Sequence, residues 1–92
     1  MVKLTDTEAA VRLSALPDWR VEEDVLVRIF SFADFRASLR FVNRVGDLAE
    51  EAGHHPDIDI RYNRVRLALV THDAGGLTAK DFDLAESIQK LP

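Results

Sequence analysis

The sequence contains no cysteine, and this absence restricts both the chemistry and the environment of the protein. Without thiols there is no disulfide framework, no thiolate zinc site and no thiol nucleophile. The lack of cysteine is compatible with a reducing compartment, so we expect the protein to be cytoplasmic.

Long apolar runs and an excess of basic charge are also missing. Residues 1–19 carry acids and a proline in place of the apolar segment of a signal peptide, and no stretch approaches the ~18 apolar residues of a membrane span. With 16 acidic and 12 basic residues, the formal net charge is −4. This balance disfavours binding to phosphate backbones and anionic lipids. We therefore expect no nucleic acid and no membrane as direct partners.

The length of the chain, 92 residues, leaves room for one domain only. Single domains typically have roughly 100–150 residues, so we treat residues 1–92 as one domain and exclude a two-domain enzyme. A domain this small buries only about 60–65% of the surface of its unfolded chain. Its stability is therefore modest, and we expect it to gain stability as a homodimer or homotetramer.

The first third of the sequence predicts a short helix followed by a hairpin. A capping box at residues 5–8 opens the helix, and Pro17 ends it. Residues 19–21 and 25–32 are rich in β-branched and aromatic side chains, and the acidic residues between them allow a turn. These two segments are expected to pair as antiparallel strands.

A longer helix is predicted over residues 34–52, and Gly53 is expected to end it. Its apolar positions form a main stripe, with a second set about 100° further around the axis. The main stripe is Phe35, Leu39, Val42, Val45, Ala49 and Ala52, and the second set is Ala37, Phe41 and Leu48. This face is wider than one contact with a sheet requires. Either it forms a subunit interface or another part of the same chain covers it, and the sequence leaves both alternatives open.

The rest of the sequence predicts a second hairpin and a last helix. Residues 57–62 alternate between apolar and polar, residues 63–64 form the turn, and residues 65–72 continue the apolar face. A capping box at residues 78–81 opens the last helix. The element order is αββαββα. It predicts an α+β domain in which three helices pack on one face of a four-stranded antiparallel sheet.

Histidines provide the main indication of chemistry, because all three lie where a predicted element ends. His54 and His55 follow the helix-capping Gly53, and His72 ends the last strand. Side chains at such positions can point into a cleft, and imidazole exchanges protons near neutral pH. The pattern suggests a general acid and a general base in one pocket. The plainer alternative is that His54 and His55 interact with the helix C-terminus and His72 is solvated.

Other chemistries have weaker support in the sequence. No serine lies in a Gly-x-Ser-x-Gly elbow, and Gly75-Gly76 is too short for a phosphate-binding loop. Three imidazoles could bind zinc, but the His-Glu-x-x-His spacing is missing. We therefore expect neither covalent catalysis nor a bound metal or other cofactor.

One spaced set of residues resembles the signature of the pterin-4a-carbinolamine dehydratases: Glu50, His54-His55-Pro56, Tyr62, His72 and Asp81. The resemblance extends from about residue 16 to the C-terminus and includes Trp19 and segments 30–35 and 62–65. The fold of that family is a four-stranded antiparallel sheet with three helices on one side. The periodicity of this sequence predicts the same arrangement.

The resemblance implies a hydro-lyase that dehydrates 4a-hydroxytetrahydrobiopterin, the pterin left by aromatic amino acid hydroxylases, to quinonoid dihydropterin. It implies catalytic roles for His54, His55 and His72. We expect His54 and His72 to transfer protons at the hydroxyl group and the ring, and His55 to assist or to position the substrate. Which histidine is the acid and which is the base stays open.

The resemblance also implies a set of pterin contacts: His54, His55, Pro56, Thr71, His72, Asp73, Ala74 and Trp19. Glu50 and Asp81 belong to the signature and are expected to support the histidines. Each supporting residue has a plainer interpretation. Asp81 can be the acid of a capping box, Glu50 a solvated helix residue and Trp19 a core residue.

Three positions depart from the common family pattern. Gly53 stands where many members carry an acid, Ala74 where animal members often carry cysteine, and Lys80 where arginine is frequent. Because the three histidines are intact, these changes affect rate and pterin affinity more than reaction type. The alternative function is a scaffold that keeps the dehydratase fold, as in relatives that act as dimerisation cofactors of a transcription factor.

Overall fold

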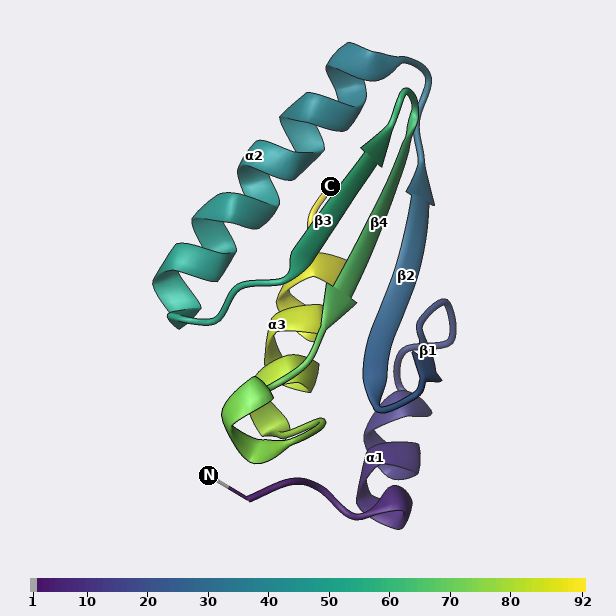
Figure 1. The fold of residues 1–92 in the computed structure, drawn as a ribbon. Helices are drawn as coiled ribbons and strands as arrows, with labels where there is room; N and C mark the ends of the chain where they lie inside the picture. Colours follow the sequence, from purple (N-terminus) through teal and green to yellow (C-terminus); the bar gives the residue numbers. More distant parts are fainter. Residues whose placement is uncertain (1) are drawn as a thin grey trace.

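The computed structural model describes residues 2–92, and its elements follow the predicted order αββαββα (Figure 1). They are α1 (Asp6–Leu13), β1 (Arg20–Glu22), β2 (Val25–Ser31), α2 (Phe35–Ala52), β3 (Asp57–Arg61), β4 (Arg64–Leu69), the short 3-10 turn η1 (His72–Ala74) and α3 (Ala79–Gln89). The predicted α+β class is confirmed.

The four strands form one antiparallel sheet in the order β1-β2-β4-β3. The register places Phe30 of β2 and Ile60 of β3 on either side of Val65 of β4. Because side chains alternate between the faces of a strand, the apolar set that includes these residues lies on one face, as the sequence predicts. Helices α2 and α3 contact each other and contribute to the hydrophobic core on this face.

The core joins the inner face of the sheet to both helices. Its fully buried members include Leu26, Val65 and Leu67 of the sheet, Val45 of α2 and Phe82 of α3. Helix α1 lies at the edge of this core, where Arg12 contacts the ring of Phe82 and pairs with Asp83 and Glu86 of α3.

Helix α2 buries only one narrow side, through Ser38, Phe41, Val45 and Ala49. This spacing of three and four residues is helical. Val45 and Ala49 belong to the predicted main stripe, and Phe41 belongs to the second set. Phe35 and Leu39 of the main stripe stay 46% and 39% exposed. Within residues 2–92, these two side chains are only partly covered.

Several element boundaries differ from the prediction. Strand β4 ends at Leu69, short of His72. Its pairing with β2 ends there, because Leu69 lies opposite Leu26, one residue from the start of β2. Thr71 forms an isolated bridge with Gly76 instead, and the intervening chain makes the turn η1. Helix α1 ends at Leu13, well before the proline that was expected to end it.

The turn between β3 and β4 also differs by one residue. It consists of Tyr62 and Asn63, because β4 already begins at Arg64. The Asn63 side chain donates a hydrogen bond to the carbonyl of Phe32 at 3.0 Å, and its own carbonyl accepts from the Phe32 amide at 2.8 Å. These contacts anchor the hairpin to the end of β2.

Among the helices of residues 2–92, none has the length and apolar character needed to span a membrane.

Candidate active site

A hollow of about 330 Å³ opens where the C-terminus of α2, the end of β4 and the N-terminus of α3 meet. All three histidines of the chain line it. The complete lining is Gly53, His54, His55, Val70, Thr71, His72, Asp73 and Lys80. The structure therefore brings together two segments that lie far apart in the sequence.

Gly53 determines how the chain enters this hollow. It ends α2 in the left-handed conformation, with φ at 62°, and its amide donates to the carbonyls of Ala49 and Glu50. A residue with a Cβ adopts this conformation less readily than glycine. The amide of His54 then donates to the carbonyl of Ala49 at 3.2 Å, so the cap fixes the backbone of the first histidine.

His54 is held by a buried carboxylate. Its Nε2 lies 2.5 Å from Oδ1 of Asp81, whose side chain is completely buried. The other oxygen of Asp81, Oδ2, accepts from the Thr71 hydroxyl and from the Thr78 amide, each at 2.9 Å. The Thr78 hydroxyl, 2.8 Å from that of Thr71, completes the network by donating to it. The side-chain oxygens of Asp81, Thr71 and Thr78 are thus all paired.

The network determines which ring nitrogen of His54 carries the hydrogen. An ionised carboxylate only accepts hydrogen bonds, so Nε2 of His54 must carry the hydrogen that it shares with Asp81. In the neutral ring, Nδ1 is then the acceptor. Within residues 2–92, Nδ1 has no hydrogen-bond partner, which leaves it available for a ligand.

His55 has a similar but exposed partner. Its Nε2 lies 2.5 Å from Oε2 of Glu50, one turn back on α2. The two side chains are 60% and 78% exposed. Because water screens an exposed pair, this contact orients the ring of His55 weakly compared with the buried contact of His54. The two signature acids, Glu50 and Asp81, therefore lie behind two different histidines.

His72 reaches the hollow from the short turn η1. The amide of Ala74 donates to the carbonyl of Thr71, and that of Gly75 to the carbonyl of His72, both at 3.0 Å. Gly75 leaves the turn in the left-handed conformation, with φ at 76°. The turn leaves His72 and Asp73 exposed at the rim of the hollow.

Three residues of the predicted pterin site, Pro56, Ala74 and Trp19, do not line the hollow. Trp19 is 3% exposed and packs edge-on against Phe30. Its indole Nε1 donates to Gln89 at 3.2 Å, at the end of α3 opposite to the hollow. The resemblance implied that Trp19 borders the pocket. In the single chain it does not, because its apolar ring is part of the core.

Three lining residues, Gly53, Val70 and Lys80, were not predicted as site residues, and Lys80 is the charged one. It lies in the first turn of α3, and within residues 2–92 it takes part in no ion pair. The N-terminus of a helix carries partial positive charge and favours acids, so a lysine there is unfavourable for the helix itself. This mismatch is the one sequence signal that could have identified it.

The arrangement can exchange protons with a bound molecule at more than one point. His54 offers an oriented acceptor, and the exposed imidazoles of His55 and His72 line the same hollow. Residues 2–92 contain no group of three or more histidine, aspartate and glutamate side chains arranged to hold a metal ion. The fold and the hollow thus define a small α+β protein in which three imidazoles line one hollow.

Comparison with known proteins identifies the family. A sequence profile described as pterin 4 alpha carbinolamine dehydratase matches residues 2–91. A protein of Acidobacterium capsulatum is 60% identical over 91 residues, which cover 99% of both chains. One of Chloroflexus aurantiacus is 58% identical, covering 99% of this chain and 98% of its own. Both are provisionally named as pterin-4-alpha-carbinolamine dehydratases. The chain belongs to the pterin 4 alpha carbinolamine dehydratase family.

Solved structures agree with this assignment. The crystal structure of a transcriptional coactivator/pterin dehydratase from Brucella melitensis superposes with a TM-score of 0.90, at 32% identity over 95% of each chain. A pterin dehydratase-like protein described as a RuBisCO assembly factor of the alpha-carboxysome superposes with a TM-score of 0.61. It covers 76% of this chain and 81% of its own at 21% identity, so it supports the fold alone.

Proposed function

We propose that the protein is a hydro-lyase that dehydrates a 4a-hydroxytetrahydropterin, such as 4a-hydroxytetrahydrobiopterin, to quinonoid dihydropterin and water. Its physiological role would be to recycle the pterin cofactor of aromatic amino acid hydroxylases. The observation that carries the proposal is the hollow lined by all three histidines, one of them oriented by a buried acid. Family membership supplies the substrate class.

The reaction requires two proton transfers and no redox change. The C4a–O bond breaks, and the leaving hydroxyl takes up a proton to become water. The electron pair of a ring nitrogen forms the new C=N bond, and the ring gives up one proton. One protonated and one neutral imidazole can exchange these two protons, so that the protein ends with the same number of protons. His54 and His72 are the proposed exchangers, with His55 assisting.

His54 contributes as an oriented group. Because its Nε2–H is held by Asp81, its Nδ1 faces a ligand without first breaking a hydrogen bond to the protein. Asp81 is a positioning residue in this scheme, since its carboxylate is completely buried and contacts His54 instead of the substrate. Thr71 and Thr78 hold Asp81 in turn.

The assembly and location follow as further parts of the proposal. Phe35 and Leu39 leave an apolar surface on α2 that supports a homodimer or homotetramer. The lack of cysteine supports a cytoplasmic location.

The direct test follows the disappearance of a 4a-hydroxytetrahydropterin by ultraviolet absorbance. We expect the protein to accelerate dehydration well above the spontaneous rate. His72→Ala is expected to lower turnover roughly 10²–10⁴-fold, the scale of general acid-base catalysis, while the far-ultraviolet circular dichroism spectrum is unchanged. A wild-type rate equal to the spontaneous rate would disprove the enzymatic function, and an unchanged rate in the folded variant would exclude His72 from the mechanism.

A chelator tests whether histidines act as acid-base groups or as zinc ligands. We expect activity to be unchanged after prolonged treatment with EDTA, because each role proposed for the imidazoles is proton transfer or positioning. Activity lost with EDTA and restored by zinc would contradict this mechanism.

A scaffold function is the second candidate. The uncovered apolar surface of α2 favours it, and the Brucella melitensis relative is described as a transcriptional coactivator as well as a pterin dehydratase. Absence of dehydratase activity together with a stoichiometric protein partner would favour the scaffold. The intact set of histidines favours the enzyme.

A further inference from the structure

Residues 3–4, which precede α1, lie across the loop that leads from β4 to α3 (Figure 1). The amide of Leu4 donates a hydrogen bond to the carbonyl of Leu77 at 2.8 Å. The Leu4 side chain packs against the core, and Leu77 is a buried member of it. Residues 3–4 therefore join the segment before α1 to the segment before α3, and we call them the strap.

Lys3 brings the strap into contact with Gly76. Gly76 is buried, and a Cβ added to it would lie 2.6 Å from Cε and 2.9 Å from Cδ of Lys3. The aliphatic part of Lys3 therefore lies directly against the backbone of Gly76, and its ammonium group is 3.2 Å from Asp24 in the turn between β1 and β2. Gly76 is outside the left-handed region, so the close contact, and not the backbone conformation, requires a residue without a Cβ.

The loop that the strap contacts carries His72. Thr71 and Gly76 pair across this loop: the Thr71 amide donates to the Gly76 carbonyl at 3.1 Å, and the Gly76 amide donates to the Thr71 carbonyl at 3.4 Å. These two hydrogen bonds close the turn η1, and His72 begins that turn. The position of the His72 imidazole thus depends on the two ends of the loop.

The two ends of the loop are held from different sides. At the first end, Thr71 donates its hydroxyl to the buried carboxylate of Asp81 at 2.9 Å. At the second end, the strap supplies the contact with Gly76 and the hydrogen bond to Leu77. The strap therefore gives the second end the support that the buried network gives to the first.

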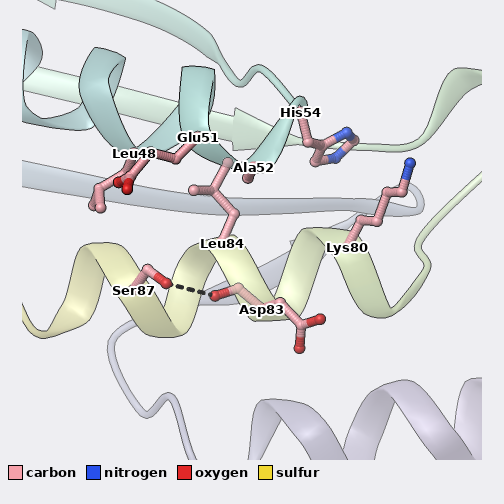
Figure 2. Close-up of a pocket in the computed structure, with 8 residues that line it drawn as sticks. All are labelled: Leu48, Glu51, Ala52, His54, Lys80, Asp83, Leu84 and Ser87. Atoms are coloured by element: carbon pink, nitrogen blue, oxygen red, sulfur yellow. Dashed lines mark hydrogen bonds between the residues drawn. The ribbon is translucent and has the colours of Figure 1, made fainter.

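His72 depends on its loop to a greater degree than the other histidines do. Figure 2 shows His54 just after the end of α2, beside Lys80 of α3, and a buried acid holds the His54 ring. His55 has Glu50 as its partner. Within residues 2–92, His72 takes part in no ion pair. The contacts that fix the backbone of the loop therefore fix this imidazole.

We propose that the strap positions His72 for the proposed proton transfer by holding the end of its loop at Gly76. The proposal rests on the proposed function, because it assigns the strap a part in the same reaction. Neither Lys3 nor Gly76 lines the hollow of the histidines, so both are positioning residues and not catalytic residues.

The strap is a local support for the loop. The side chains of Lys3 and Asp24 are 42% and 55% exposed, and water weakens such an ion pair, so its loss changes the stability of the whole domain little. A loop held by few contacts opens locally without unfolding of the rest of the domain. Loss of the strap should therefore leave the fold intact and let the turn η1 open more often.

The first test changes the side chain of the strap. Lys3→Ala should lower kcat roughly tenfold and change KM less than about twofold, because a displaced imidazole slows proton transfer. Lys3→Arg keeps an aliphatic part and a positive charge, and should retain kcat within about twofold. Lys90→Ala is the control, since Lys90 is an exposed lysine at the C-terminal end of α3, and it should change neither value.

Hydrogen exchange locates the effect in the loop. The amides of Ala74 and Gly75 donate to the carbonyls of Thr71 and His72 within the turn. In Lys3→Ala both amides should exchange roughly tenfold faster, while the amides of α2 keep their rates. This pattern distinguishes loss of the strap from destabilisation of the whole fold.

Gly76→Ala tests the same contact from the other side. The added Cβ requires the flexible side chain of Lys3 to move away, so this variant should lower kcat as much as Lys3→Ala does. In the double variant Lys3→Ala/Gly76→Ala, kcat should be no lower than in either single variant, because both changes remove one contact. Gly46→Ala is the control, since no atom lies within 4 Å of its added Cβ.

A second double variant tests whether the strap acts through His72. In a protein that already carries His72→Ala, the further change Lys3→Ala should alter the residual kcat less than about twofold, because no imidazole is left to position. The measurement uses enough protein for the residual rate to exceed the spontaneous rate.

The outcomes separate this proposal from the proposed function. If the wild type is active and Lys3→Ala keeps its kcat, or lowers kcat as strongly without His72, only this proposal fails. Unchanged exchange at Ala74 and Gly75 also contradicts it, as do effects of Lys3→Ala and Gly76→Ala that add in the double variant. If the wild type does not accelerate dehydration, the proposed function fails, and the catalytic part of this proposal fails with it.

Discussion

Asp81 is the residue on which the orientation of His54 depends. Its two oxygens have separate tasks: Oδ1 faces His54, and Oδ2 accepts from Thr71 and Thr78. A capping box alone would use only the contact to Thr78. The additional contact to His54 joins the start of α3 to the active site, so both interpretations of Asp81, as a cap and as a support, describe the same side chain.

Asp81→Asn is expected to move the hydrogen of the neutral His54 ring from Nε2 to Nδ1. Because two donors converge on Oδ2, the amide oxygen of asparagine must occupy that side, and its NH2 group then faces His54. Nε2 becomes an acceptor and Nδ1 carries the hydrogen. We expect kcat to fall roughly 10²-fold. The ¹⁵N resonances of the imidazole report the change of tautomer directly.

Asp47→Asn is the matched control, because Asp47 is an exposed residue of α2 that does not line the hollow of the histidines. It should leave kcat and the imidazole resonances unchanged. If Asp81→Asn keeps full activity and a hydrogen on Nε2 of His54, the positioning role of Asp81 is refuted.

Residue patterns predicted part of the site. The histidines were found because they follow element ends, and the family spacing added Asp81 and Glu50. Lys80 was not predicted as a site residue, since its part in the hollow depends on the packing of α3 against the end of α2. Trp19 was assigned to the pterin site by resemblance, but the single chain places its ring in the core. Such placements depend on tertiary contacts that local patterns do not encode.

At the scale of elements, the end of α2 determines where two histidines lie. Gly53 allows the chain to leave the helix in the left-handed region, and His54 follows immediately. The chain offers an internal comparison, because Gly46 lies within α2 without a positive φ and with no atom within 4 Å of an added Cβ.

The two glycines are expected to respond to alanine in opposite ways. Gly53→Ala should lower the free energy of unfolding by about 1 kcal/mol, because alanine is strained at positive φ, and should reduce kcat by displacing His54 and His55. Gly46→Ala should raise the free energy of unfolding by about 0.5–1 kcal/mol, because alanine has a higher helix propensity, and should leave kcat unchanged. Urea denaturation at a fixed protein concentration measures both values. A stabilised Gly53→Ala variant with normal activity would contradict the role of the cap.

Element types were predictable to a greater degree than element ends. Periodicity, capping boxes and β-branched composition identified the four strands and three α-helices of residues 2–92, but not the short 3-10 turn η1. The end of β4 was missed because it depends on where the pairing with β2 ends, and β2 is a neighbour of β4 in space and not in sequence. The prediction placed this turn at residues 63–64, one residue later than the observed turn at Tyr62 and Asn63. Asn63 contacts Phe32 of the first hairpin, and a local sequence pattern does not show this contact.

At the scale of the whole molecule, the uncovered side of α2 is the main unexplained surface. The sequence predicted a wide apolar face but could not tell whether this chain or another covers it. Phe35 and Leu39 remain exposed in the single chain, so no other part of this chain buries them. The subunit interface is the alternative that stays open.

Charged substitutions on this surface test whether it is a subunit interface. We expect the wild type to sediment as a dimer or tetramer, and the double variant Phe35→Glu/Leu39→Glu to sediment as a smaller species, because burying two carboxylates is unfavourable. Val11→Glu is the control, since Val11 is 66% exposed on α1. It should leave the assembly unchanged. A monomeric wild type, or an unaltered assembly in the double variant, would show that this surface is not the interface.

The central claim is that three imidazoles surround one bound pterin. The most direct measurement is a titration of protein labelled with ¹⁵N at its three histidines with a stable 7,8-dihydropterin, followed by NMR. The account predicts that the resonances of His54, His55 and His72 all shift along saturation curves with a single Kd. If the resonances of His72 stay constant while those of His54 and His55 saturate, or if none of them moves, the three histidines do not form one site.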